Sequence, residues 1–271
     1  YIAKSVKEKT AKDYRQIAAK NILPKLGKRN LDEVERVEVV RLIDTVATRA
    51  PILANRTLGL LKQFFDWAIG RGDIAMNPAL GIPKAMKETP RERILSLTEM
   101  RKIYSAACSL SPANKLFIQM LLLTGQRAGV IAKLCRTEWL DDHLEIAGER
   151  NKSGERILVP LSAIAQKKLA EVGHSNGSFL VSTTNGLKPI SGFSKLKKKI
   201  DLLSGVTDWR LHDIRRGLAT HFEDNGVDRF YVERLLNHKD NSVTGIYAKS
   251  NQLEMRRNIF EQWSRVLTSK D

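Results

Sequence analysis

The sequence has few of the residues that stabilise secreted, zinc-binding or membrane-spanning proteins. It contains two cysteines, Cys108 and Cys135, in apolar surroundings and without CxxC spacing. We therefore expect reduced core thiols, with no disulfide and no metal site. The longest apolar run, 116–124, is interrupted by Gln119 and is far shorter than the ~20 residues of a membrane span. No signal-peptide pattern is present, which favours a cytoplasmic protein without a membrane partner.

Acidic residues are also in the minority. Asp and Glu number 30 against 46 Lys and Arg, which gives a formal net charge of +16 and a pI near 9.9. Lys and Arg outnumber Asp and Glu by 16 to 9 in residues 1–85 and by 30 to 21 in the remainder, so neither half is merely a basic tail. The excess indicates a polyanionic partner, first nucleic acid and second an anionic membrane. A basic but simply solvated surface is the alternative.

The length of 271 residues predicts two domains, each large enough to bury a core. Residues 1–85 show helical periodicity throughout. A charged, proline-bounded stretch follows, and we assign residues 86–94 as a linker. Residues 95–271 form the second domain. The expected fold class is mainly α with a small antiparallel β-sheet (α+β).

Three helices are expected in the first domain. The first is capped by Ser5 and ends near Asn21, before Pro24. The second spans about Val37 to Thr48, and the third begins at Pro51. The second helix should turn Val40, Leu42, Ile43 and Val46 inward.

The third helix carries polar residues on its predicted outer face. These are Asn55, Arg56, Lys62 and Gln63. A helix that enters a DNA groove presents such a face, so the first three are candidate DNA contacts. An ordinary solvated face has the same composition.

The second domain begins with a capping signal at Ser96 and a helix through Ala107. A buried helix, Ala113 to Thr124, should end at Gly125. Arg127 then emerges just beyond a core helix.

Two short β-like runs, 143–146 and 156–160, are joined by a polar turn and predict a hairpin with Lys152 at its tip. An exposed loop allows such a lysine to enter a site without disturbing the core.

Further elements complete the second domain. A helix is expected at 162–172, a short strand at 179–181 and a final amphipathic helix at 252–267, whose aromatic stripe needs a partner in its own domain or in a neighbouring subunit. A lysine run lies between them, and its Lys195, Lys197 and Lys198 are candidate phosphate contacts, with a solvated helix face as the alternative.

The stretch from Asp208 to Lys249 brings together His212, Arg215, His238 and Tyr247. Attack on a phosphodiester adds negative charge to the nonbridging oxygens, and guanidiniums stabilise that charge best. Arg127 and Arg215 can therefore clamp one phosphate. Tyr247 is the candidate nucleophile and His212 its general base.

Lys152 is the candidate acid for the leaving 5′ oxygen. With these cations in place no metal or cofactor is expected, in keeping with the lack of a convincing carboxylate cluster.

Four motifs carry a resemblance to a known family. They are TGQR at 124–127, NKSG at 151–154 before a VPLS strand, HDIRR at 212–216 and LLNHKDNSVTGIY at 235–247. In content, order and spacing they resemble the tyrosine recombinases, or phage-integrase family, of the prophage and genomic-island type. The resemblance covers nearly the whole chain, with 1–85 similar to the helical core-type DNA-binding domain and 95–271 to the catalytic domain.

The resemblance implies roles for six residues. Arg127 and Arg215 bind phosphate, Lys152 is the general acid, His212 pairs with Arg215, His238 is a further phosphate donor, and Tyr247 forms a covalent 3′-phosphotyrosine. It also implies a site-specific recombinase that integrates or excises a mobile element.

The implied partners are double-stranded DNA at attachment or core sites and, on that DNA, three further copies of the chain. We expect a homotetramer on DNA and a monomer when free, with accessory DNA-bending or directionality proteins as further candidates. The implied location is the cytoplasm of a bacterium, on nucleoid DNA. The start at Tyr1 and the family's usual arm-binding domain indicate that an upstream part is missing, and in the family the C-terminal helix commonly docks on a neighbouring subunit, which would use the stripe of 252–267.

Three positions depart from the family pattern. Val130 stands where an acidic residue is usual, so a carboxylate that would buttress the basic site is missing or its role has moved elsewhere. Gly217 replaces a common Thr and should loosen its helix slightly. Asn237 replaces a glycine, and if that position is left-handed Asn tolerates it well.

Two alternatives remain from these residues. One is a catalytically decayed DNA-binding protein, and the other is a type IB topoisomerase-like enzyme that nicks and reseals DNA.

Overall fold

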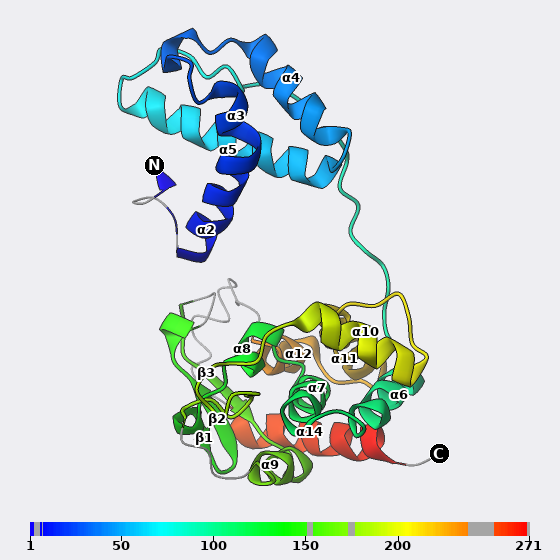
Figure 1. The fold of residues 1–271 in the computed structure, drawn as a ribbon. Helices are drawn as coiled ribbons and strands as arrows, with labels where there is room; N and C mark the ends of the chain where they lie inside the picture. Colours follow the sequence, from blue (N-terminus) through cyan, green and yellow to red (C-terminus); the bar gives the residue numbers. More distant parts are fainter. Residues whose placement is uncertain (3–5, 7, 151–153, 173–176, 238–251, 270–271) are drawn as a thin grey trace. The chain divides into compact units, whose positions relative to one another are not determined.

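Two separate hydrophobic cores organise the chain. The computed structural model describes residues 1–2, 6, 8–150, 154–172, 177–237 and 252–269. The cores lie in two compact units, Tyr1–Arg91 and Glu92–Asp271 (Figure 1). The fold is mainly α with one small antiparallel sheet, as predicted. Among the described residues, no helix combines the length and the hydrophobicity that a bilayer crossing requires.

The first unit is built of helices that pack through apolar residues at helical spacing. In chain order they are α2 (Glu8–Ile17), the π-helix η1 (Ala18–Ile22), α3 (Leu23–Leu26), the 3-10 helix η2 (Leu31–Glu33), α4 (Arg36–Ala47) and α5 (Pro51–Gly70). α4 and α5 supply most of the core, with Val39 rather than Val40 in the fully buried position. Pro51 is the first residue of α5, where its missing N–H has no intrahelical partner to lose.

Pro24 does not end the first helical segment, contrary to the prediction. The chain passes from α2 through the π-helix η1 into α3, and Pro24 lies in the first turn of α3. A proline in a first turn removes no helical hydrogen bond. The helical path therefore continues to Leu26. Ser5, the predicted N-cap, lies outside the described residues.

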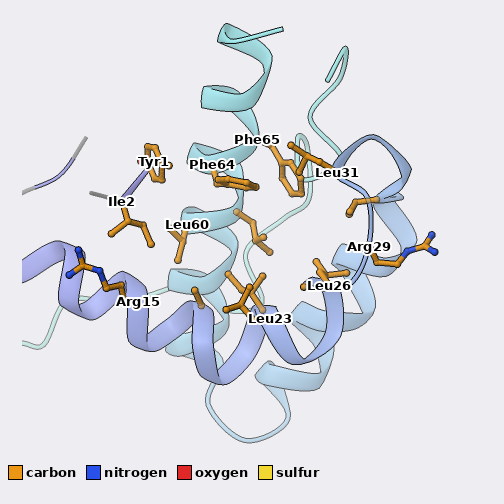
Figure 2. Close-up of a pocket in the computed structure, with 15 residues that line it drawn as sticks. Tyr1, Ile2, Arg15, Leu23, Leu26, Arg29, Leu31, Leu60, Phe64 and Phe65 are labelled. Atoms are coloured by element: carbon orange, nitrogen blue, oxygen red, sulfur yellow. The ribbon is translucent and has the colours of Figure 1, made fainter. Parts of the chain in front are cut away.

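An apolar cavity of about 540 Å³ lies between these early helices and α5 (Figure 2). Leu23, Leu60 and Phe64 are among its lining residues, and the guanidinium groups of Arg15 and Arg29 point away from it. The lining is therefore mainly apolar packing surface.

The second unit combines helices with a three-stranded sheet. Its elements are α6 (Leu97–Ala107), α7 (Pro112–Thr124), α8 (Ala128–Ala132), η3 (Arg136–Glu138), β1 (Trp139–Leu140), β2 (His143–Ile146), η4 (Gly148–Arg150), β3 (Ile157–Pro160), α9 (Ala163–Ala170), α10 (Phe193–Ser204), α11 (Leu211–Asp224), α12 (Arg229–Leu235) and α14 (Leu253–Thr268). The sheet order is β1-β2-β3, antiparallel, with Leu144 opposite Val159. The predicted hairpin is thus present, and β1 adds a strand that the sequence did not reveal.

α7 is the centre of the second unit. Every residue from Leu116 to Thr124 is buried, because α6, α9, α11 and α14 pack around it. The helix starts at Pro112 and ends at Gly125, whose φ of +60° is left-handed. A side chain at Gly125 would meet Leu236 Cδ2 at 2.8 Å. Gly125 therefore both ends the helix and lets α12 approach it.

Two local predictions for the second unit are wrong. Residues 179–181 do not form a strand, because their backbone bonds go to different segments: Phe179 and Leu180 donate to Gly186 and Leu134 respectively. An isolated bridge joins Cys135 to Phe179. Cys108 is not a core thiol either, since it is the exposed C-cap residue of α6.

The aromatic stripe of the final helix finds its partner within its own unit. Phe260, Trp263 and Leu267 of α14 are buried in the second core. Trp263 Nε1 donates to the Leu122 carbonyl of α7 at 2.8 Å. Of the two partners considered for this stripe, its own unit is therefore the one observed.

Gly217 has a packing role in α11. A Cβ at this position would lie 2.7 Å from the Leu95 carbonyl oxygen and 3.4 Å from Met100 Sδ. The absence of a side chain at Gly217 therefore does more than loosen the helix, because it allows α11 to approach the start of α6 closely.

We predict that Gly217→Ala lowers the free energy of unfolding by about 1–3 kcal/mol, because overpacking forces the backbone of Leu95 to move. Gly129→Ala in α8 is the matched control, since no atom lies within 4 Å of its Cβ, and it should be neutral or slightly stabilising. Urea unfolding of both variants tests this. Equal stabilities would show that Gly217 is not needed for packing.

Candidate active site

The site is built where the end of α7 meets α11 and α12. The left-handed turn at Gly125 directs the chain out of the core, and Arg127 becomes the N-cap residue of α8. Its side chain is half-buried, with Nη1 3.5 Å from the Asn237 carbonyl. The predicted emergence of Arg127 beyond a core helix is therefore observed.

Arg215 is the most buried cation of the site, with 3% of its surface exposed. It lies on α11, where Nη1 donates to the Gly125 carbonyl at 3.0 Å and Nη2 donates to the Leu236 carbonyl. Burial, followed by the charge of Arg127, lowers the pKa of Arg215 to about 9. The carbonyls that hold Arg215 are uncharged, and Arg127 adds a second positive charge. The site therefore has a strong positive potential, which favours binding of an anion.

His212 lies one turn before Arg215 on α11, and its side chain is partly covered but still accessible to solvent. Partial burial and then the charge of Arg215 lower its pKa, while Asp213 acts in the opposite direction. The neutral imidazole is thus favoured near pH 7, which leaves a ring nitrogen able to accept a proton. Residues at i and i+3 share a helix face, so His212 and Arg215 face the same region.

A buried amide, Gln126, joins the end of α7 to the end of α12. Its Nε2 donates to the Leu235 carbonyl at 2.8 Å, and its Oε1 accepts from Asn237 Nδ2 at 2.9 Å. Asn237 has a φ of +50°, which confirms the left-handed position expected there. This role of Gln126 was not predicted, although the residue lies within the TGQR motif. A polar residue between a helix-ending glycine and a basic residue was the available signal.

The missing acidic residue has a structural counterpart. Val130 is buried in the hydrophobic core, so this position serves packing. The partners of the two arginines are instead the carbonyls of Gly125, Leu236 and Asn237. Backbone carbonyl dipoles therefore hold the two arginines in place of a side-chain carboxylate. They neutralise less of the positive charge of the site than a carboxylate would.

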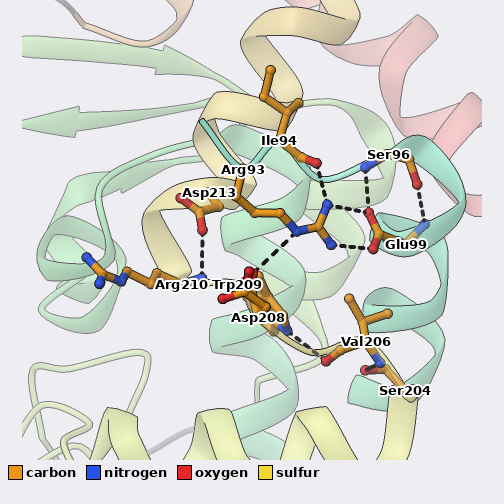
Figure 3. A network of polar contacts seen from close by, with 10 residues as sticks. All are labelled: Arg93, Ile94, Ser96, Glu99, Ser204, Val206, Asp208, Trp209, Arg210 and Asp213. Carbon is orange, nitrogen blue, oxygen red and sulfur yellow. Dashed lines mark hydrogen bonds and ion pairs between the residues drawn. The ribbon is translucent and has the colours of Figure 1, made fainter. Parts of the chain in front are cut away.

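A polar network fixes the start of α11 (Figure 3). Arg93 pairs with Glu99 of α6 and donates to the Asp208 carbonyl at 3.3 Å. Glu99 also completes a capping box with Ser96, which was predicted as a cap. Asp213 accepts from the Arg210 backbone N–H at 2.8 Å. The first residues of the second unit are thereby fastened to the turn that leads into His212 and Arg215.

Lys152, His238 and Tyr247 lie outside the described residues. Their flanking elements are described, with β2 and β3 on either side of Lys152, and α12 and α14 on either side of the other two.

Two of the candidate DNA contacts in the first unit have structural roles. Asn55 was expected on an outer face but is 7% exposed, and its amide donates to the Met86 carbonyl and to Glu88 Oε1, both at 2.9 Å. Lys62 is half-buried and donates to the Ile82 carbonyl at 2.8 Å. Both fasten the chain after α5 onto that helix. Arg56 and Gln63 are exposed.

The lysine run on α10 also contains both exposed lysines and a lysine that contacts its own unit. Lys195 and Lys198 are exposed. Lys197 pairs with Asp201 at 2.5 Å and lies over the Trp209 ring, 4.4 Å from its centroid. Lys197 is therefore engaged by its own unit and is a poor candidate for a phosphate contact.

Two family models match the chain. The model of the phage integrase family covers residues 93–254, and that of the phage integrase central domain covers residues 1–85. The chain belongs to the phage integrase family. Its arginines at the end of α7 and on α11 fall within the first of these matches.

Similar proteins agree with this membership. The integrase of Escherichia phage HK022 is 27% identical over 93% of this chain and 73% of its own length. Prophage integrase IntZ of Escherichia coli is 25% identical over 97% and 67%. Tyrosine recombinase XerD of Listeria innocua is 26% identical over 86% and 83%. This phage integrase family member is a site-specific recombinase of the tyrosine type.

The fold is also that of solved integrases. A lambda integrase dimer bound to a COC′ core site has a TM-score of 0.72 at 22% identity and covers 89% of this chain and 91% of its own. A lambda integrase tetramer bound to a Holliday junction gives the same TM-score over 89% of this chain and 74% of its own.

We predict that the histidines make stability depend on pH between 7.5 and 5.5. His212 and His221 both have pKa values below the ordinary 6.5, chiefly through burial. As the pH falls through about 6.5 the unfolded chain binds these protons first, so the folded state loses stability. The melting temperature of the chain should fall over this range.

Substituting both residues (His212→Asn, His221→Asn) should flatten the fall, because the carboxylates titrate at lower pH. Each single variant should give part of the effect. An unchanged slope in the double variant would assign the pH dependence to other groups.

Proposed function

We propose that this recombinase cleaves and rejoins DNA through Tyr247, on a phosphate held by Arg127 and Arg215. The observation that carries this proposal is the pairing of a buried Arg215 with Arg127 and His212, at the junction of α7 and α11. The charge of Arg127 acts on Arg215, and in the described part of the chain the hydrogen-bond partners of both guanidiniums are backbone carbonyls and include no carboxylate. A scissile phosphate supplies the opposite charge that this arrangement favours.

The proposed reaction is an in-line displacement at phosphorus. Tyr247 Oη attacks the phosphate while His212 accepts the phenolic proton, and a bond from Tyr247 to phosphorus forms as the bond to the 5′ oxygen breaks. Lys152 gives a proton to that leaving oxygen. Arg127, Arg215 and His238 stabilise the charge on the nonbridging oxygens. Reversal by another strand's 5′ hydroxyl rejoins DNA without an external energy source, because the phosphotyrosine conserves the bond energy.

We further propose that residues 1–85 form a core-type DNA-binding domain and that the chain assembles as a tetramer on two DNA duplexes. The basic excess in both units supports DNA as the partner, as do the lambda integrase structures on a core site and on a Holliday junction. The biological outcome would be integration or excision of a prophage or genomic island on the bacterial nucleoid. Accessory DNA-bending or directionality proteins would select between the two directions.

A nicked suicide duplex carrying the element's attachment site tests the chemistry. The wild-type chain should form a covalent protein–DNA adduct, and Tyr247→Phe should form none because the nucleophilic oxygen is lost. Arg215→Gln should lower the rate of adduct formation about 100- to 1,000-fold while the affinity for DNA changes little. Denaturing gels measure the adduct, and fluorescence anisotropy measures the affinity.

Melting curves of the Arg215→Gln variant serve as the folding control, with Arg215→Lys as the charge-retaining comparison. Absence of an adduct with the wild-type chain would favour a DNA-binding protein without catalysis. Relaxation of supercoiled plasmid by monomers, with no need for paired sites, would favour a topoisomerase.

The lysines of α10 provide a matched pair for DNA affinity. Lys198→Gln should weaken binding for all sequences and reduce the slope of log K against log salt by about 1, because one phosphate contact is lost. Lys197→Gln should leave that slope unchanged and lower stability instead, because it removes the contacts with Asp201 and Trp209. Salt-dependent anisotropy and urea unfolding separate the two. A slope for Lys198→Gln that equals the wild-type slope would exclude Lys198 from the interface.

A further inference from the structure

The second unit has a polar pocket that the recombination chemistry does not use. It has a volume of about 400 Å³ and lies between the end of α6, the first half of α7, the end of α9 and the segment near Ser182. This volume is within the range of small-molecule sites. Lys115 and Gln119 of α7 line it, and a spacing of four residues places them on one helix face. Lys115 precedes Gly125 by about 15 Å along the helix axis, so the pocket is remote from Arg127.

Gln119 lines the pocket with a buried side-chain amide that is only partly hydrogen-bonded. The residue is 1% exposed, and its Nε2 lies 3.7 Å from Cys108 Sγ, to which it donates. Its Oε1 is buried and has no hydrogen-bond partner in the described part of the chain. Buried amide oxygens are normally paired, so an N–H or O–H of a small molecule in this pocket would complete the amide.

The rim of the pocket is positively charged. Lys115 and Lys168 line it together with one carboxylate, Glu171. Lys168 donates to Glu171 at 2.7 Å, and this hydrogen bond, with the charges of Lys168, Lys115 and Lys167, lowers the pKa of Glu171. Two lysines against one carboxylate favour a molecule that carries negative charge.

Cys108 adds a reactive group to the same pocket. Its thiol is free and exposed at the end of α6. Cys135 is the contrasting thiol, since it is less exposed and burial raises its pKa, which disfavours the reactive thiolate.

We propose that this pocket is a modification site in which Cys108 forms a mixed disulfide with a small anionic peptide thiol. The peptide's amide N–H groups would satisfy Gln119, and one of its carboxylates would pair with Lys115, because Lys168 already donates to Glu171. In the exchange, the Cys108 thiol gives its proton to solvent and the sulfur attacks one sulfur of a low-molecular-weight disulfide. The new S–S bond forms as the old one breaks, and the other half leaves as a thiolate that takes up a proton. Cys108 is oxidised, and the half of the small disulfide that leaves is reduced to a thiol.

The test uses two disulfides on the full chain. Glutathione disulfide is anionic and carries amide N–H groups, whereas 2-hydroxyethyl disulfide is neutral and lacks them. Peptide mass mapping gives the rate of modification at Cys108 with each reagent. We expect Lys115→Gln to slow the reaction with glutathione disulfide about threefold, as loss of one partly exposed ion pair would, and to leave the reaction with the neutral reagent unchanged.

Further variants separate recognition from simple exposure. Gln119→Leu should also slow only the glutathione disulfide reaction, and Lys199→Gln, which alters an exposed lysine outside the pocket, should slow neither. Cys108→Ser should abolish the adduct that Lys199→Gln retains. If Lys115→Gln changed the two reagents' rates equally, or changed neither, Cys108 would be an ordinary surface thiol and the proposal would be overturned.

Discussion

The burial of the Arg215 guanidinium is the constraint on which the second unit depends. Taking this charge out of water, with the charge of Arg127 beside it, lowers the pKa of Arg215 to about 9, which means that the charged folded state is disfavoured. Two carbonyl hydrogen bonds, from Gly125 and Leu236, offset part of that cost. Both carbonyls belong to helix ends, where oxygens lack intrahelical partners and carry partial negative charge. The ends of α7 and α12 must therefore converge on α11.

That convergence explains several residues that have no direct chemical role. Gly125 leaves room for Leu236, and Gly217 leaves room for the backbone of Leu95. Gln126 joins the ends of α7 and α12 through its amide. The carboxylate that family members usually place near the first arginine is replaced by Val130, which packs in the core. Backbone carbonyls give weaker compensation than a carboxylate, so the site keeps more of its positive charge for a phosphate.

The sequence predicted those features that arise from neighbouring residues. Helical periodicity, the Ser96 capping box, the Gly125 stop and the hairpin strands are local patterns, and the structure has them. The motifs also placed Arg127, His212 and Arg215 in one site, through the family resemblance. The features that the sequence did not reveal concern partners distant in the chain. Asn55 and Lys62 resemble exposed polar residues of a helix, yet each is bonded to a segment that returns after α5.

The same limitation applies to Lys197 and Lys198, which are adjacent and chemically identical. Helix geometry turns neighbouring side chains about 100° apart, so one lies over Trp209 beside Asp201 and the other faces solvent. Composition alone assigns both to DNA. A lysine already held by a carboxylate must give up that pair before it binds a phosphate, whereas an exposed lysine exchanges only water and counterions. The number of cations available for phosphate contacts is therefore smaller than the 46 Lys and Arg of the sequence, and tertiary pairing decides which of them remain. Arg215 is the opposite case, because its partners are neutral and its full charge remains directed at the site.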